Sequence, residues 1–236
     1  MDTRSLIWLL RMTMRGLYTG HAGRINACAF GGADDTVIVS GSFDSTVRLW
    51  DTKSQSTRPL MTLTEAKDAI SAIYVTGHQI MAGCVDGKVR MYDLRKGSVD
   101  VDIIGCPVTS ITPSKANDSY LVSTLDSTIR LMDGMNGRLL QSFRDANYTN
   151  TNYRIRSTLA MADSMVISGS EEGNILVWDL LSGVVQHRLW HGKSGERGTG
   201  EGGKKDVVSA VAWNQLRKEW ASAGGDGDVV VWGAVR

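Results

Sequence analysis

One short pattern occurs five times in the chain, and this internal repeat restricts the possible folds more than any other feature. In each copy an acidic residue is followed six positions later by a large side chain, and Gly or Ser stands directly after the acid. The five pairs are Asp44 and Trp50, Asp86 and Tyr92, Asp126 and Met132, Glu172 and Trp178, and Asp226 and Trp232. Successive large residues are separated by 42, 40, 46 and 54 positions. This spacing indicates an array of similar supersecondary units.

Each repeat has the sequence pattern of four short strands. In the first repeat, runs rich in Val, Ile and Ser are bounded by Gly, Asp and Asn. These runs predict strands at 25–30, 36–40, 46–50 and 60–63. Four strands in a repeat of this length form one blade of a β-propeller, and neighbouring blades bury their apolar faces against each other. The expected fold is therefore all-β, a single propeller domain over 1–236.

The repeat also predicts where the blades begin and end. Four complete blades are expected at 20–64, 65–105, 106–144 and 145–191, followed by a Gly-rich insert at 192–205 and a three-stranded blade at 206–236. Residues 1–19 carry a faded copy of the pattern, Asp2 to Trp8, and predict a half-blade. These units do not add up to a closed ring. We expect an incomplete or open propeller of about five blades that lacks about two at its N-terminal side.

The acid of each repeat is suited to a tight turn, because Asp accepts hydrogen bonds from turn N–H groups. A tryptophan on the next strand can donate its indole N–H to a serine of the preceding strand, Ser40 for Trp50 and Ser168 for Trp178. A preceding His completes the set only in the first repeat. The predicted structural tetrad there is His21, Ser40, Asp44 and Trp50. The other repeats lack this His, so we expect their blades to be less rigidly tied.

Composition argues against several classes of function. Hydrophobic residues make up 42% of the 236 residues, and 26 basic side chains face 25 acidic ones for a net charge of +1. This balance gives no general attraction to nucleic acid or acidic membranes. Three cysteines without CxxC spacing predict neither disulfides nor a zinc site and fit a reducing compartment. The apolar run at 5–10 is too short to span a membrane.

Patterns that resemble catalytic or cofactor sites have simpler structural interpretations. The segment 192–205 contains a GxGxxG that begins at Gly198, but a predicted strand follows it where a dinucleotide site needs a helix. We therefore expect a flexible loop there. The four histidines are scattered over different repeats without metal-ligand spacing. Because the turn acids recur in every repeat, they indicate folding instead of catalysis. The sequence predicts a non-enzyme with no metal, no cofactor and no small-molecule substrate.

A propeller carries variable loops on rigid blades, and binding positions usually lie on such loops. The candidate contacts are the residues directly before the turn acids. They are Phe43, Val85, Leu125 and Glu171. An exposed Phe43 beside the mouth of the ring would serve as an aromatic anchor. The sequence therefore predicts a platform that binds other proteins.

Four segments resemble the mitogen-activated protein kinase organizer family of WD-repeat (WD40) scaffolds, over a region from about residue 18 to the C-terminus. They are GHAGRIN (20–26), VSGSFDSTVRLWD (39–51), AGCVDGKVRMYDLR (82–95) and LVSTLDSTIR (121–130). The resemblance implies a seven-bladed propeller in cytoplasm and nucleus whose partners are kinase-cascade components and splicing factors of the spliceosome. The family's first two blades are absent here, and 192–205 is an insert. Of the two roles we favour pre-mRNA splicing, because the kinase role is tied to animal signalling partners.

One motif supports an alternative function. Tyr92-Asp93-Leu94-Arg95 matches the WD-x-R box of propellers that serve as substrate receptors of cullin-4 ubiquitin ligases. In that interpretation Arg95 is a further partner contact. In the structural interpretation, Asp93 and Arg95 solvate the end of a strand.

Overall fold

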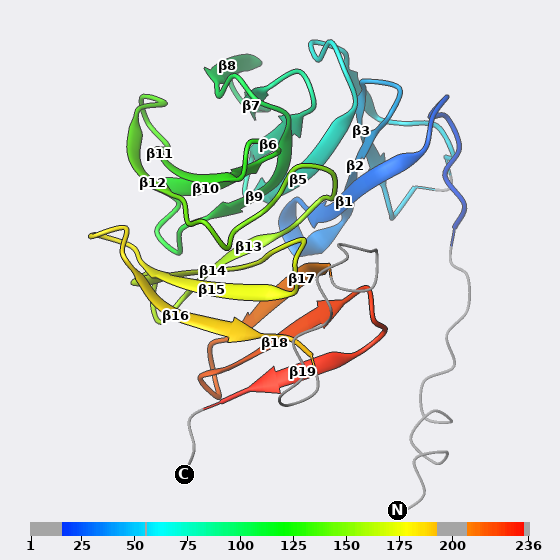
Figure 1. Ribbon diagram of the computed structural model, residues 1–236. Helices are drawn as coiled ribbons and strands as arrows, with labels where there is room; N and C mark the ends of the chain where they lie inside the picture. Colours follow the sequence, from blue (N-terminus) through cyan, green and yellow to red (C-terminus); the bar gives the residue numbers. More distant parts are fainter. Residues whose placement is uncertain (1–15, 55, 193–206, 234–236) are drawn as a thin grey trace, which may run out of the picture.

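The computed structural model describes residues 16–54, 56–192 and 207–233. These residues form 19 strands in five antiparallel sheets, with one short 3₁₀ turn, η2 (Ala33–Asp35). The sheets are arranged around a common centre (Figure 1). This arrangement confirms the all-β propeller fold predicted from the repeat. Within the described ranges, no helix is long and apolar enough to cross a membrane.

We number the sheets as blades 1 to 5 in chain order. Blade 1 consists of β1 (Ile25–Gly31), β2 (Val37–Ser42), β3 (Val47–Asp51) and β4 (Met61–Leu63). Blade 2 consists of β5 (Ile70–Thr76), β6 (Gln79–Cys84), β7 (Lys88–Asp93) and β8 (Ser98–Ile103). Blade 3 consists of β9 (Val108–Pro113), β10 (Ser119–Thr124), β11 (Thr128–Asp133) and β12 (Leu139–Phe143).

Blade 4 consists of β13 (Ser157–Ala160), β14 (Met165–Gly169), β15 (Asn174–Asp179) and β16 (Val185–Trp190). Blade 5 consists of β17 (Val208–Asn214), β18 (Glu219–Gly224) and β19 (Val229–Trp232). Within every blade the strands lie side by side in chain order. The strands of blade 1 begin and end within two residues of the expected ranges.

The first strand of each blade lies at the centre of the ring (Figure 1). β1 contacts β5, β5 contacts β9, β9 contacts β13, and β13 contacts β17. Residues of β1, β5, β9, β13 and β17 together line one central hollow of about 440 Å³. The innermost strands therefore form the wall of a channel.

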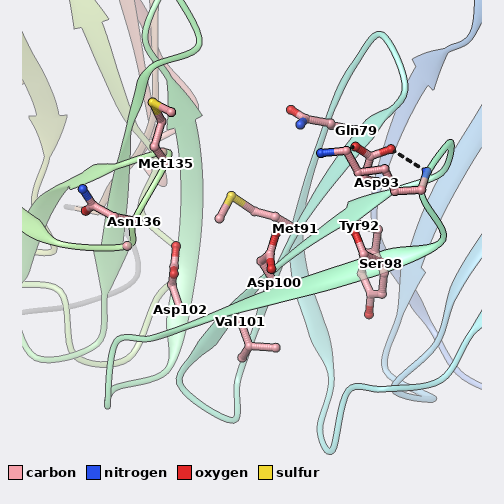
Figure 2. A pocket seen from close by; sticks show the side chains of 13 residues that line it. Gln79, Met91, Tyr92, Asp93, Ser98, Asp100, Val101, Asp102, Met135 and Asn136 are labelled. Atoms are coloured by element: carbon pink, nitrogen blue, oxygen red, sulfur yellow. Dashed lines mark hydrogen bonds and ion pairs between the residues drawn. The ribbon is translucent and has the colours of Figure 1, made fainter.

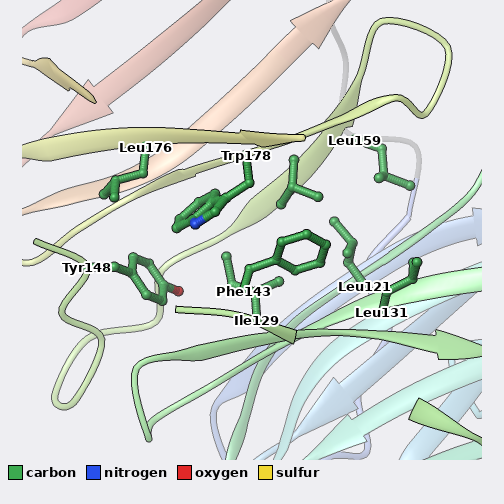
Figure 3. Close-up of a cluster of buried hydrophobic side chains, with 9 residues drawn as sticks. Leu121, Ile129, Leu131, Phe143, Tyr148, Leu159, Leu176 and Trp178 are labelled. Carbon is green, nitrogen blue, oxygen red and sulfur yellow. The ribbon is translucent and has the colours of Figure 1, made fainter. Parts of the chain in front are cut away.

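Apolar side chains between neighbouring blades form the core. Between blades 3 and 4, Phe143 and Tyr148 pack edge-on against Trp178, with ring centroids 6.3 and 5.5 Å from the indole (Figure 3). Trp178 and Phe143 are completely buried. Similar clusters join blades 1 and 2, blades 2 and 3, and blades 4 and 5. Because successive side chains of a strand point to opposite faces of its sheet, one set of apolar side chains faces each of the two neighbouring blades.

The outer face of blade 5 is bare in the described part of the chain. Val229 and Val231 of β19 are 69% and 67% exposed, whereas Val89, at the position of blade 2 that corresponds to Val229, is fully buried. The five sheets therefore form an open ring within the described ranges, as the count of repeats predicts. The expected half-blade lies mostly outside the described residues, and 16–19 are not in a strand. Nearly all of the 192–205 insert also lies outside them.

The turns between second and third strands explain the Gly or Ser that follows each acid. In all five turns this residue has a positive φ, and glycine adopts such a conformation without strain. Ser45 and Ser127 occupy it at φ 63° and 54° in blades 1 and 3, and glycines occupy it in the other blades. The repeated pattern therefore reflects the conformation of the turn as well as the packing of the core.

Candidate functional site: the turn face of the propeller

Each turn between second and third strands is hydrogen-bonded to the loop that enters its own blade. We call the surface made by these turns and loops the turn face. The same backbone bond occurs in all five blades: Phe43 N–H to Arg24 (2.8 Å), Val85 to Ala69 (3.0 Å), Leu125 to Pro107 (3.1 Å), Glu171 to Thr149 (2.9 Å) and Gly225 to Val207 (2.8 Å). The residue before each turn acid is therefore held at an equivalent position around the ring.

In blade 1 the turn is tied by the predicted tetrad. The His21 ring bonds through Nδ1 to the Asp44 carboxylate at 2.9 Å and through Nε2 to the Ser40 hydroxyl at 2.7 Å. Trp50 donates its indole N–H to the same hydroxyl at 2.8 Å. These bonds connect the entering loop, the second strand, the turn and the third strand in one buried network.

Asp44 is the most heavily bonded group of this network. Its carboxylate also accepts bonds from the backbone N–H of Ala22 at 2.8 Å and from the backbone N–H and hydroxyl of Thr46 at 3.0 and 2.7 Å. Burial raises the pKa of Asp44, but the bonds from Thr46, His21 and Ala22 outweigh it and hold the pKa well below its usual range. Asp44 is therefore ionised at neutral pH and serves as a fixed acceptor.

A second tetrad is present in blade 5, so the expectation that only the first repeat is complete was wrong. His191 Nδ1 lies 2.8 Å from the Ser222 hydroxyl, and Trp232 donates its indole N–H to that hydroxyl at 2.8 Å. The other His191 nitrogen lies 3.5 Å from the Asp226 carboxylate without a hydrogen bond, so the link between His and acid is weaker than in blade 1. The signal was present in the sequence, but the insert after His191 lengthens the distance from His to acid and hides it.

Blades 2 and 3 tie their turns with arginine instead of histidine. Arg90 contacts both carboxylate oxygens of Asp86, at 3.2 and 2.7 Å, and Arg130 contacts Asp126 at 3.2 and 2.5 Å. Burial raises the pKa of Asp126, but the bonds from Arg130 and Thr124 outweigh it and lower the pKa to about 2. These blades are therefore not loosely tied, and the missed signal is an arginine four residues after the acid.

Blade 4 departs from the predicted hydroxyl bond. The Trp178 indole N–H has no hydrogen-bond partner among the described residues, and the Ser168 hydroxyl instead donates to the Gly169 carbonyl at 3.1 Å. The ring of Tyr148 packs perpendicular to the Trp178 indole, and in blade 1 the His21 ring lies edge-on to Trp50. The expected Ser168–Trp178 pair was wrong.

A matched pair of serine substitutions measures the difference between blades 1 and 4. Ser40→Ala is expected to lower the free energy of unfolding by about 2 kcal/mol, because it leaves the Trp50 and His21 nitrogens buried without a partner. Ser168→Ala should cost less, since no indole N–H depends on it. Urea unfolding followed by circular dichroism checks both values. Equal losses for the two variants would contradict a stabilising role of the tetrad.

The four predicted contacts differ in exposure. Phe43 is 60% exposed on the turn of blade 1, as an aromatic anchor requires. Val85 and Leu125 are half-buried. Glu171 is only 8% exposed, so the expectation that it faces a partner was wrong. Its carboxylate is used internally, where it accepts bonds from the loop that enters blade 4.

The WD-x-R box lies away from the turn face, at the end of β7. The Asp93 carboxylate accepts the backbone N–H groups of Arg95 at 2.9 Å and Lys96 at 3.1 Å, which closes the turn into β8. Arg95 is exposed. Beside the box, a hollow of about 320 Å³ opens between blades 2 and 3, with Asp100 and Asp102 along its wall (Figure 2). Asp93 thus has the structural role that the simpler interpretation predicts.

The described ranges contain no group of three or more His, Cys, Asp or Glu side chains that could hold a metal ion. His21 bonds the turn network of blade 1, and His191 bonds that of blade 5. Cys28, Cys84 and Cys106 are free thiols. The turn face is a surface of backbone turns held by equivalent hydrogen bonds, and these turns carry different side chains.

Residues 13–173 match the β-propeller family described as the nucleolar protein 10-like, N-terminal domain, over more than half of the chain. The chain belongs to this family. Its curated relatives are WD-repeat proteins, and propellers of this kind are generally non-catalytic platforms that bind proteins. The WD40 assignment made from the repeat is thereby confirmed.

Rat WD repeat domain-containing protein 83 is 44% identical over 133 residues, which is 56% of this chain and 42% of the relative. An uncharacterised WD repeat-containing protein of Schizosaccharomyces pombe is 41% identical over 128 residues, 54% of this chain and 42% of the relative. The chain thus matches less than half the length of these relatives. Among solved structures, the computationally designed Ika8 protein matches with a TM-score of 0.68 at 23% identity, covering 91% of this chain and 60% of that one. That likeness concerns the fold alone.

Proposed function

We propose that this WD40 protein is a non-catalytic scaffold that holds partner proteins on its turn face. The observation that carries the proposal is Phe43, a large apolar side chain left 60% exposed on a turn that the His21–Asp44 network fixes in place. An exposed aromatic on a rigid support loses little conformational entropy on binding, and such residues dominate protein interfaces.

Splicing factors are the partner class that we favour, with kinase-cascade components second. The support is the resemblance of segments such as 39–51 and 82–95 to kinase organizer scaffolds, which implies both roles and a location in nucleus and cytoplasm. The balanced net charge of +1 agrees with binding to the protein components of such particles instead of to their RNA.

Affinity purification from nuclear extract tests this proposal. The full chain is expected to recover spliceosomal proteins, and Phe43→Asp should reduce their recovery about tenfold or more, since it puts a charge into an apolar contact. The matched control is Leu216→Asp, because Leu216 is 96% exposed on the β17–β18 turn, away from the turn face. Recovery of kinase-cascade members alone would favour the second partner class. If neither class is recovered, or if Phe43→Asp changes nothing, the proposal fails.

The alternative is a substrate receptor of a cullin-4 ubiquitin ligase. Arg95 supports it, because its side chain is exposed at the end of β7 and Asp93 bonds only its backbone. Arg95→Ala is expected to abolish binding to the cullin-4 adaptor without loss of stability, as measured by co-precipitation and thermal unfolding. Unchanged adaptor binding in this variant removes the alternative.

A further inference from the structure

The central channel is lined by small and hydroxyl-bearing side chains with one cation among them. Its wall includes Ser71, Thr109, Ser110 and Thr158, and Arg156 is the one charged side chain of the described lining. Arg156 directly precedes β13 and is exposed. An exposed guanidinium therefore faces a hollow of about 440 Å³ whose wall offers hydroxyl groups.

Two further arginines lie at the same end of the inner strands as Arg156, outside the lining of the hollow itself. Arg154 stands two residues before Arg156. Arg24 stands directly before β1 of blade 1, which faces blade 4 across the channel. Burial lowers the pKa of Arg154, and the positive charge of Arg24 lowers it further. Arg24 and Arg154 are thus close enough for their charges to repel each other. Among the described residues, none of the three arginines has a carboxylate within ion-pair distance.

Glu171 holds the segment that carries two of these arginines. Its carboxylate accepts the backbone N–H groups of Thr151, Asn152 and Tyr153 at 2.6, 2.6 and 2.9 Å, and the Thr151 hydroxyl at 2.9 Å. On the other side, Ile155 is fully buried and the Arg156 N–H bonds the Ser209 carbonyl at 3.0 Å. The backbone of Arg154 and Arg156 is therefore fixed before any ligand arrives.

Repelling cations without counter-charges are stabilised by an anion, and guanidinium groups bind carboxylate and phosphate in a bidentate manner. We propose that Arg24, Arg154 and Arg156 form a binding site for an anionic side chain, phosphate or carboxylate, in an extended segment of a partner protein. The inference deepens the scaffold proposal and rests on it. RNA fits less well, because three arginines at one end of the inner strands do not make the long basic stripe that follows a nucleic-acid backbone.

The test uses the purified full chain and three fluorescein-labelled twelve-residue peptides in fluorescence anisotropy. One peptide carries a central phosphoserine, the second carries Glu there, and the third carries Ser in a neutral sequence. We expect both anionic peptides to bind and the neutral one not to bind. Tighter binding of the phosphopeptide indicates a phosphorylated partner, and equal binding indicates an acidic one. Affinity should fall as salt is raised.

Arg24→Ala, Arg154→Ala and Arg156→Ala are each expected to weaken anionic peptide binding about tenfold, because each removes a charge-assisted contact. Arg154→Glu should abolish it. The matched control is Arg138→Ala, an exposed arginine on the outer turn between β11 and β12. Circular dichroism establishes that the exposed substitutions leave the fold intact.

The inference is overturned if neither anionic peptide binds, if the arginine variants bind like the wild type, or if a uridine oligomer binds more tightly through the same arginines. These failures leave partner recovery through Phe43 untouched and so spare the scaffold proposal. Loss of all partner recovery with intact peptide binding would instead remove the scaffold proposal while the anion site stands.

Discussion

Trp178→Ala is expected to lower the free energy of unfolding by about 3–5 kcal/mol, the range for a large aromatic removed from a packed core. The indole is completely buried between blades 3 and 4 and packs edge-on against Phe143 and Tyr148. The surroundings are sheets and cannot collapse into the space that is left. Because single domains are stable by only about 5–15 kcal/mol, this loss brings the fold close to unfolding.

Urea unfolding followed by circular dichroism measures the loss. The control is Leu181→Ala, since Leu181 is 87% exposed and its removal should change stability by less than about 0.5 kcal/mol. Trp178→Phe should lie between the two, because it shortens the side chain without breaking an indole hydrogen bond. A loss below about 1 kcal/mol in Trp178→Ala would show that the apolar cluster between blades 3 and 4 contributes little to stability.

Asp44→Ala is expected to lower the free energy of unfolding by about 3 kcal/mol at neutral pH, because it leaves the buried His21 and the N–H groups of Ala22 and Thr46 without their acceptor. The pKa of Asp44 is depressed in the folded state, so its contribution is fully present above the unfolded value of 3.8. That contribution is lost as the pH falls below this value toward the folded pKa.

The difference between wild type and Asp44→Ala should therefore be largest at pH 5 to 7 and shrink as the pH falls from about 4 to about 2. Urea unfolding at a series of pH values checks this. Asp100→Ala is the control, because Asp100 is exposed on β8 and its carboxylate has no hydrogen bond among the described residues. A difference that grows toward acid pH would contradict the assigned role of the ionised carboxylate.

The sequence predicted the blades well because strand, turn and core requirements coincide in one repeated pattern. Strand alternation, a turn acid and a residue with positive φ all fall at fixed steps, so the first tetrad could be placed residue by residue. The second tetrad was missed for a plain reason. His21 precedes Asp44 by 23 positions, whereas His191 precedes Asp226 by 35, since the insert lies between the two halves of the network.

Glu171 and the arginines of the channel could not be predicted from position within the repeat. Thirteen residues separate β12 from β13, whereas four separate β8 from β9. The long loop folds over the turn of blade 4, which buries Glu171 and brings Arg154 toward Arg24. Such contacts depend on how a loop crosses the ring, and a repeat pattern carries no information about that path.

The backbone bond that recurs in every turn has a consequence for how this surface changes. Phe43, Val85, Leu125, Glu171 and Gly225 occupy the same place, and each is held there through its amide hydrogen. Except at Glu171, whose carboxylate also holds the loop into blade 4, the shared bond does not depend on the side chain, and it excludes proline because proline lacks the amide hydrogen. New specificity can be installed there by single substitutions, one turn at a time, while the ring beneath stays as it is.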